Sequence, residues 1–247
     1  MNRDAIGALV GSGRVAEIFA YGDGVLKLYR SPDAKADAFR EAAALAIAAS
    51  HGLAVPEVTE VGTFDGRWGL AMGRAPGTVL AELGVGREGE VVAEMVRLHR
   101  LIHAKSEARL PSLKERLATR IGQVTQLDSD KHARLLGKLN LLPDGDHICH
   151  GDFHPFNIMG MPGTVIVVDW LDATSGPSEA DVCRSYVLLM PHMPSLAEAY
   201  LAAYCAASGC ERSGVLAWLE IVAAARLAEG TSDEPWLLDL LHGMDSS

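Results

Sequence analysis

The stretch HGDFHPFNIM, residues 150–159, constrains the fold more than any other part of this sequence. Two histidines, an aspartate and an asparagine surround Pro155, whose ring fixes one backbone angle and keeps the preceding residue extended. The apolar run VIVVDW follows and predicts a strand that delivers Asp169 at its end. The combination indicates either a solvated turn or a stiff loop where acceptor and metal-ligand side chains meet.

Composition limits the class of protein. The chain has 247 residues, of which 49% are apolar, and this suits one large domain or two lobes that share a cleft. No apolar run reaches the length of a membrane span and the N-terminus lacks a signal-peptide pattern, so we expect no membrane partner. Four cysteines without CxxC spacing predict free thiols in a reducing cytoplasm: Cys149, Cys183, Cys205 and Cys210.

The acidic charge of the chain is uneven. The net charge of −10 indicates that nucleic acid is not a partner, and nothing in the sequence defines an oligomeric state. Residues 172–247 hold eleven acids and only three basic residues, all arginine. This excess is typical either of a solvated acidic surface or of a site that attracts a cationic ligand.

The first third of the chain predicts a small antiparallel sheet with one helix. Alternating or clustered β-formers predict strands, and the turn YGDG predicts a hairpin between the first two of them. The strands are expected over residues 15–22, 24–30, 57–64 and 67–74, and the helix over 31–50.

The remainder is mostly helical, with a short β region on both sides of the opening motif. The apolar periodicity predicts helices over residues 90–104, 110–124, 128–142, 195–209, 212–230 and 234–243. Pro76 and Gly77 mark a boundary, so we predict an α+β protein with lobes at 1–75 and 76–247.

The polar residues of the motif have the spacing of a phosphoryl-transfer site. Asp152 and Asn157 are five positions apart, as in the protein-kinase loop HRDxxxxN. Asp152 is therefore the candidate catalytic base, and His150 is expected to anchor the loop. Asn157 and Asp169 are the candidate Mg²⁺ ligands, because Mg²⁺ prefers oxygen atoms.

An upstream stretch supplies candidate nucleotide contacts. GSGRVAEI resembles the kinase Gly-rich loop but has alanine in place of the third glycine. In VLKLY, a strand turns Lys27 away from its leucine neighbours, and Glu41 lies on the following helix, where an ion pair with Lys27 is expected. The candidate nucleotide-binding residues here are Gly11, Ser12, Gly13, Lys27 and Glu41.

Two groups of histidines offer metal sites of another kind. His147, His150, Asp152 and His154 could form a hydrolase site, although their spacing matches no HExxH or HxHxDH pattern. His99 and His103 are four apart on a helix and could chelate a metal, but without a neighbouring acid in that pattern a helix-packing or surface role is favoured.

With these motifs, the chain resembles the aminoglycoside phosphotransferase family. HGDFHPFNIM and VIVVDWLDATSGPSEADV resemble its signatures, and FREAAALAIAASHGLAVPEV resembles its segment around the glutamate. The resemblance implies a bilobal protein-kinase-like fold and a brace of the catalytic region by Asp181. It also implies, through LAMGRAPG, an adenine-contacting hinge at Met72, Gly73, Arg74 and Ala75.

The resemblance implies a phosphotransferase that uses Mg²⁺ and ATP or GTP, with the nucleotide between the lobes and a small-molecule hydroxyl as acceptor. The acceptor is either an aminoglycoside or other amino-bearing compound, or a choline, homoserine or sugar-type substrate. A cationic acceptor would meet acids of the last third, for which the candidates are Asp172, Glu179, Glu229, Asp233 and Glu234.

Two other functions compete with this reading. Only 78 residues follow Asp169 and no APE-type segment is present, which disfavours a protein kinase. A nucleotide-binding module without catalysis is the second alternative, and the presence of every expected polar residue disfavours it.

Overall fold

A computed structural model describes residues 6–83, 86–161 and 164–245. The chain forms two compact units, which we call unit 1 (Met1–Leu83 and Pro155–Asp172) and unit 2 (Gly84–His154 and Ala173–Ser247). These bounds differ from the sequence-based lobes at 1–75 and 76–247, because the chain returns to unit 1 after residue 154.

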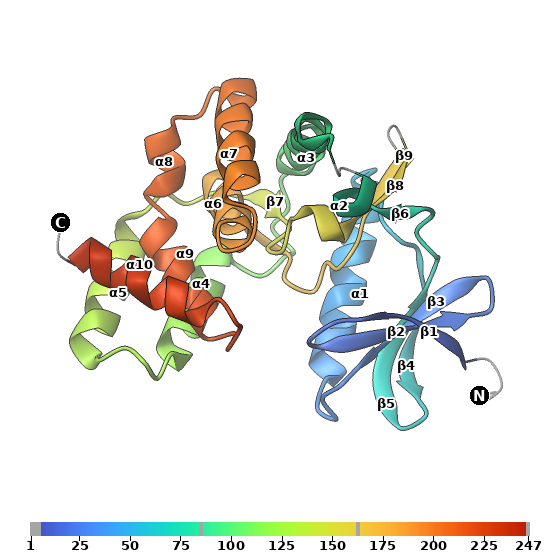
Figure 1. Cartoon of the computed structure of the whole chain (residues 1–247). Coiled ribbons are helices and arrows are strands. Elements are labelled where there is room, and N and C mark those ends of the chain that lie inside the picture. Colours follow the sequence, from blue (N-terminus) through green and yellow to red (C-terminus); the bar gives the residue numbers. More distant parts are fainter. Residues whose placement is uncertain (1–5, 84–85, 162–163, 246–247) are drawn as a thin grey trace. The chain divides into compact units, whose positions relative to one another are not determined.

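Unit 1 contains the predicted antiparallel sheet (Figure 1). Its strand order is β1-β2-β3-β5-β4, and the helix α1 packs against β4 and β5. Leu26, Leu28, Phe64 and Ala71 form a hydrophobic core on the sheet. The elements are β1 (Ile6–Ser12), β2 (Ala16–Tyr21), β3 (Gly24–Tyr29), α1 (Lys35–Ser50), β4 (Val58–Phe64) and β5 (Arg67–Met72). The four predicted strands and the helix are present, and β1 is an additional strand.

A second, three-stranded sheet explains why residues 155–172 belong to unit 1. β6 (Thr78–Val79) pairs with β8 (Ile158–Met161), which in turn pairs with β9 (Thr164–Val167). The short helix α2 (Leu80–Leu83) and the 3₁₀ turn η2 (Pro155–Asn157) contact each other beside this sheet. Backbone hydrogen bonds therefore join segments about 80 positions apart in sequence.

The described residues of unit 2 are mainly helical, with a small sheet in which β7 (His147–Cys149) pairs with β10 (Thr174–Gly176). The central helix α9 packs against α4, α5, α6 and α10. The predicted helix over 212–230 is two helices, which separate where Trp218 is buried. The helices are α3 (Glu88–His103), α4 (Leu113–Gln123), α5 (Ser129–Leu141), α6 (Ser178–Leu189), α7 (Pro194–Ser208), α8 (Arg212–Leu216), α9 (Leu219–Leu227) and α10 (Glu234–Asp245).

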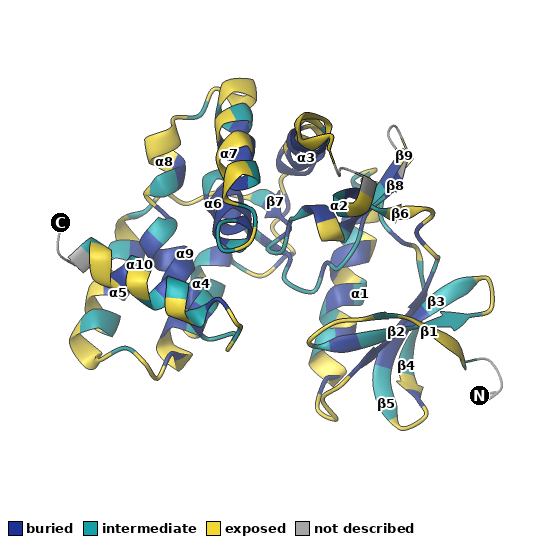
Figure 2. Cartoon of the chain, in the orientation of Figure 1, coloured by how far each residue is buried: buried dark blue, intermediate teal, exposed yellow. Residues whose placement is uncertain are grey.

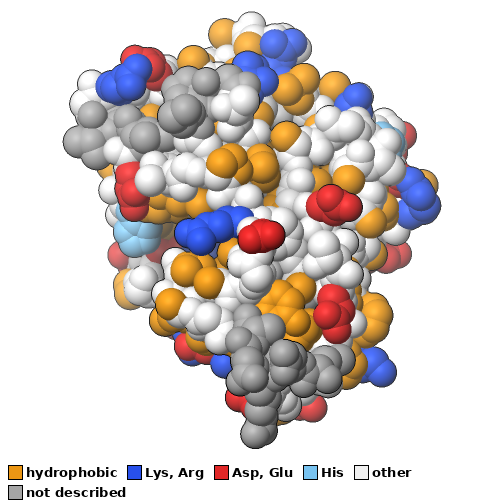
Figure 3. Space-filling view, turned by 90° about the vertical axis from the view of Figure 1, so that its right-hand side faces the viewer, with side chains coloured by type: hydrophobic (Ala, Val, Ile, Leu, Met, Phe, Trp, Pro, Cys, Tyr) orange, Lys and Arg blue, Asp and Glu red, His pale blue; other side chains and the backbone are white. Residues whose placement is uncertain are grey.

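The helices of the two units differ in how much of their surface is buried. Figure 2 shows α6 and α9 largely buried, whereas α1, α3 and α7 each expose one side. On the face drawn in Figure 3, hydrophobic side chains form small groups among charged and other polar side chains. None of the described helices is both long and apolar enough to cross a membrane. All four cysteines are free thiols.

Candidate active site

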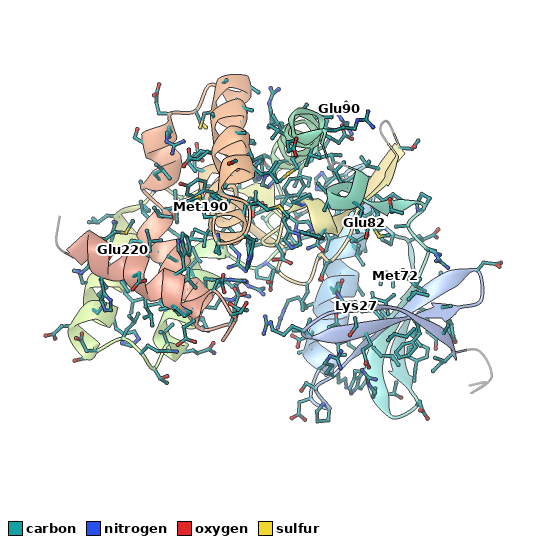
Figure 4. All side chains as sticks on the ribbon, viewed as in Figure 1. Lys27, Met72, Glu82, Glu90, Met190 and Glu220 are labelled. Carbon is teal, nitrogen blue, oxygen red and sulfur yellow. The ribbon has the colours of Figure 1, made fainter. Side chains whose placement is uncertain are left out.

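Three of the predicted site residues meet within unit 1, where Lys27 contacts both Glu41 and Asp169. Strand alternation turns Leu26 and Leu28 into the core of the sheet and Lys27 to the other face, where it is labelled in Figure 4. Its Nζ lies 2.8 Å from Glu41 Oε1 and 2.8 Å from Asp169 Oδ1. Residues 14 and 142 positions away in sequence therefore meet at one buried ammonium group.

Glu41 reaches Lys27 from α1 and is itself buried. The Tyr29 hydroxyl donates a hydrogen bond to its second carboxylate oxygen. Burial alone would lower the pKa of Lys27, but the Glu41 and Asp169 carboxylates outweigh it and raise the pKa above its usual value. Tyr29 was not predicted, although its position two residues after Lys27 puts it on the same face of β3.

The hairpin β8–β9 holds Asn157 and Asp169 at one end. Ile158 pairs with Val167, and the Val168 N–H donates to the Asn157 carbonyl oxygen over 2.9 Å. Asn157 therefore lies just before one strand and Asp169 just after the other. The predicted strand extended to Asp169, but β9 ends at Val167 and the chain turns there.

Asn157 and Asp169 suit a hard divalent cation. Both offer oxygen atoms, and Mg²⁺ takes one or two protein ligands together with waters and phosphate oxygens. The Asp169 side chain is 36% exposed, so the carboxylate is not sealed in the core. Asp169 also has φ +64, which is uncommon for a residue other than glycine and marks a backbone held by its surroundings. The donor set thus fits Mg²⁺.

The predicted phosphate-binding residues lie at the turn between β1 and β2. Gly11 and Ser12 end β1, and the Gly13 N–H donates to the Ala16 carbonyl oxygen over 2.9 Å. Arg30 holds the turn from the end of β3, with Nε 3.1 Å from the Gly13 oxygen and Nη2 2.8 Å from Ser12 Oγ. Arg30 was not predicted, and it adds a cation beside this turn.

The predicted hinge follows β5. Met72 ends the strand and is buried, as is Ala75, whereas Arg74 is exposed. The Gly73 N–H donates to the Glu57 carbonyl oxygen over 2.8 Å. That donor is already used within unit 1, so adenine contacts would come from the other backbone groups of residues 72–75.

In unit 2, Asp181 organises the loop that carries Asp152. We call residues 150–154 the polar loop. The N–H groups of His150 and Gly151 donate to the Asp181 carboxylate, over 2.6 Å and 2.9 Å. Gly151 has φ +81, a backbone conformation that favours glycine. The Asp152 N–H donates to His150 Nδ1 over 3.2 Å. The backbone N–H groups of His150, Gly151 and Asp152 are therefore all hydrogen-bonded.

His99 and His103 complete the surroundings of Asp181. Their Nε2 atoms lie 2.9 Å and 3.1 Å from its Oδ2, and their Nδ1 atoms meet the hydroxyls of Tyr200 and Tyr204. Burial lowers the pKa of His99 to about 3, so His99 is neutral and the Tyr200 hydroxyl donates to its Nδ1. Burial alone would raise the pKa of Asp181, but the facing histidines hold it well below its usual value.

This arrangement bears on the two alternative metal sites. Among the described residues, His99, His103 and Asp181 are the one group of three metal-ligating side chains close enough to share an ion. Their four ring nitrogens are already committed to Asp181 or to tyrosine hydroxyls, in keeping with the packing role. Within the described residues, the hydrolase set does not form a group of three side chains close enough to share an ion; this set is His147, His150, Asp152 and His154.

Asp152 is a half-buried carboxylate between cationic and imidazole groups. His154 Nε2 lies 3.4 Å from its Oδ2, and Arg184 Nη2 lies 3.9 Å from its Oδ1. Burial alone would raise the pKa of Asp152, but His154 and Arg184 outweigh it and hold the pKa below its usual value. Asp152 is therefore ionised and can accept a hydrogen bond.

The suggested acceptor contacts are largely occupied. Asp172 belongs to unit 1, whereas the other four belong to unit 2. Glu229 and Asp233 are paired with arginines, and Glu234 accepts a hydrogen bond from Gln126 over 3.0 Å. The acidic excess of the last third is thus partly neutralised by bases from earlier in the chain, among them Arg120.

Comparison with known proteins identifies the family. Residues 11–218 match the phosphotransferase enzyme family, a span that includes the predicted catalytic, nucleotide-binding and metal-binding residues. The chain belongs to the phosphotransferase enzyme family. A comparison with curated proteins found no match.

Solved structures with the phosphotransferase fold resemble this chain over nearly all of its length. A complex of aminoglycoside phosphotransferase APH(4)-Ia with ADP and hygromycin B has a TM-score of 0.71 and 17% identity, covering 96% of this chain and 93% of that one. Aminoglycoside-3'-phosphotransferase of type VIII has a TM-score of 0.65 and 22% identity, with coverage of 91% and 93%. A choline/ethanolamine kinase family protein from Mesorhizobium loti has a TM-score of 0.63 and 18% identity, with coverage of 96% and 84%.

The phosphotransferase neighbours confirm the predicted kinase-like fold and the suspected family. At these identities the likeness concerns the fold alone. The acceptor of this phosphotransferase therefore has to be inferred from its own residues.

Proposed function

We propose that this protein is a small-molecule kinase that transfers the γ-phosphate of ATP or GTP to a hydroxyl group. The observation that carries the proposal is the Lys27 ammonium group, which is buried and bonded to both Glu41 and Asp169. A nucleotide kinase needs a cation fixed in this way for the phosphates. The solved neighbours with ADP or AMP-PNP support a nucleotide cosubstrate.

Unit 1 would bind the nucleotide. Lys27 would contact the phosphates, and the turn at Gly11, Ser12 and Gly13 would cover them. The backbone of residues 72–75 would meet the base. Asn157 and Asp169 would hold Mg²⁺, which neutralises charge on the phosphate oxygens when it is bound.

Asp152 in unit 2 would receive the acceptor hydroxyl as a hydrogen-bond donor and take its proton. Its ionised state and the rigid polar loop suit this role. Because phosphoryl transfer passes through a loose transition state, the main contribution of such a carboxylate is to orient the attacking oxygen.

The acceptor would be a small hydroxyl compound. Hygromycin B is bound to one neighbour, and other neighbours are a choline/ethanolamine kinase family protein and an amicoumacin kinase. An amino-bearing acceptor drawn by acids of unit 2 is one candidate, and a neutral sugar is the other. The arginine partners of Glu229 and Asp233 reduce the pull of those two acids on an amine.

A panel of hydroxyl compounds, screened for acceptor-dependent ADP production from Mg·ATP, tests the proposal. The panel should contain aminoglycosides, choline, homoserine and neutral sugars. Asp152→Asn should lower turnover by about two to four orders of magnitude and leave nucleotide affinity nearly unchanged. Tight Mg·ATP binding without phosphate transfer to any compound would instead support a binding module, and phosphorylation of peptides would support a protein kinase.

A further inference from the structure

Arg184 reaches the polar loop from α6. Its Nε donates a hydrogen bond to the Gly151 carbonyl oxygen over 3.0 Å. Its Nη2 lies 2.7 Å from Glu229 Oε1 but 3.9 Å from Asp152 Oδ1. The guanidinium therefore has two carboxylates within reach and is hydrogen-bonded to only one of them.

Glu229 is the centre of a cluster of arginines. Arg184 from α6, Arg120 from α4 and Arg226 from α9 all contact its carboxylate, with Arg120 Nη1 at 2.8 Å. Arg226 also lies 3.1 Å from Asp233. The Glu229 side chain is only 7% exposed, so these contacts are poorly screened by water.

We infer that Glu229 is a positioning residue, whose carboxylate holds the Arg184 guanidinium on the Gly151 carbonyl and off the Asp152 carboxylate. This role rests on the proposed function, in which Asp152 accepts the hydrogen bond of the acceptor hydroxyl. A guanidinium bonded directly to Asp152 would occupy the oxygen lone pairs that the hydroxyl needs.

The physical reason lies in the burial of Arg184, which is 8% exposed. A buried guanidinium that loses its carboxylate partner is costly, so it moves to another anion within reach. Asp152 is 3.9 Å away, so a small side-chain rotation would suffice. Glu229 thereby decides which of two carboxylates Arg184 binds.

Glu229→Gln removes the charge and keeps the shape of the side chain. We expect kcat to fall about 10- to 100-fold, whereas the KM for the nucleotide stays within about twofold, because unit 1 is unchanged. Glu229→Asp keeps the charge and should hold kcat within about fivefold of wild type. An equal loss in the two variants would overturn the inference, because the charge would then not be what matters.

Glu220 provides a matched control (Figure 4). It lies on α9, the helix that Glu229 follows by two residues, and is 3% exposed. Three basic side chains hold it, those of Arg134, Lys131 and Lys138. All three partners lie on α5, whereas the polar loop comes after β7. Glu220→Gln should lower the free energy of unfolding much as Glu229→Gln does, with kcat within about threefold of wild type. A comparable loss of kcat in Glu220→Gln would mean that Glu229 acts only through stability.

The double variant Glu229→Gln/Arg184→Gln separates positioning from simple structural support. If Glu229 acts by restraining Arg184, removing the guanidinium as well should make the double variant no slower than Glu229→Gln alone. Independent roles would instead multiply the two losses of kcat, and that result would contradict the inference.

A crystal structure of Glu229→Gln tests the geometry without turnover, so it remains decisive if the proposed function proves wrong. We expect an Arg184 nitrogen at about 2.8 Å from an Asp152 oxygen. Arg184 remaining beside residue 229 with Asp152 unchanged would overturn the inference. Absence of phosphate transfer in the wild-type protein would contradict the proposed function instead, irrespective of this distance.

Discussion

At the scale of single residues, several titratable groups of this protein lie where water screens charge least. Lys27 and Glu41 are 4% and 1% exposed, and His99 and Asp181 are likewise buried. A buried charge is stable only when opposite charges and hydrogen bonds replace its hydration. Each of these side chains has such partners, so removing one partner affects the others.

Lys27→Met retains most of the side-chain stem and leaves Glu41 and Asp169 without their cation. We expect the free energy of unfolding to fall by about 3–5 kcal/mol, because two carboxylates lose their shared partner. Affinity for ATP should fall more than affinity for adenosine, as measured by calorimetric titration, since adenosine has no phosphates. Equal losses for both ligands would identify Lys27 as purely structural. Tyr29→Phe, which removes one hydrogen bond to Glu41 and keeps the cation, is the matched control.

His99 predicts how stability depends on pH. The folded state keeps its imidazole neutral with a pKa of about 3, whereas the unfolded chain binds a proton near pH 6.5. Stability from this group is complete above pH 6.5 and is lost as the pH falls toward 3. We expect a slope of about 1.4 kcal/mol per pH unit below about pH 6. Urea unfolding between pH 6.5 and 4.5 should show a shallower slope for His99→Gln, and an unchanged slope would contradict this assignment.

At the scale of elements, β3 and β5 approach each other closely beside Lys27. A β-carbon added at Gly69 of β5 would overlap the Lys27 carbonyl oxygen and lie 2.8 Å from Leu28 Cδ2. The backbone of Gly69 thus packs directly against the Lys27 carbonyl group and the core side chain of Leu28. Only glycine fits this position without a shift of one strand.

Gly69→Ala should displace β3 and lower the free energy of unfolding by roughly 1–3 kcal/mol, the scale of overpacking. Because the shift falls on Lys27, the affinity for ATP should fall with stability. Gly62→Ala in β4 is the control, since no atom lies within 4 Å of the added carbon there. Chemical denaturation and ATP titration of the two variants provide the comparison, and equal effects in both would show that the contact at Gly69 is not tight.

These elements also show what the sequence could reveal. The strands at 15–22, 24–30, 57–64 and 67–74 were predictable, because alternation and turn residues act locally. β6 and β10 were not predictable, because strands of two and three residues exist only through distant partners. For the same reason, motif spacing suggested Lys27 with Glu41, whereas the contact of Arg184 with Glu229 has no local pattern.

At the scale of the whole molecule, the distribution of charge in space differs from its distribution along the chain. The acids of residues 172–247 outnumber the bases there, but Glu229 pairs with Arg120 and Glu220 with Lys138, both from earlier helices. This pairing has no signature in the local sequence, because the bases lie on α4 and α5 and meet these acids only when both helices pack against α9. The net charge of −10 remains, but part of it is not available to a ligand.

The acceptor KM should therefore depend only weakly on salt. Between low ionic strength and about 0.3 M, we expect the KM for amino-bearing acceptors to rise less than about threefold, because paired acids attract an amine weakly. Neutral sugars measured beside the amines provide the control, and their KM should not change. A tenfold or larger rise for the amines alone would show that unpaired acids meet the acceptor.

The divided course of unit 1 has a consequence for how this chain is made. A ribosome releases residues 1–83 long before residues 155–172, although both belong to one compact unit. During that interval β6 lacks β8, and Lys27 has Glu41 but not Asp169 as a counter-charge. Unit 1, although its first segment is synthesised first, is therefore completed only after the first segment of unit 2, Gly84–His154, has left the ribosome.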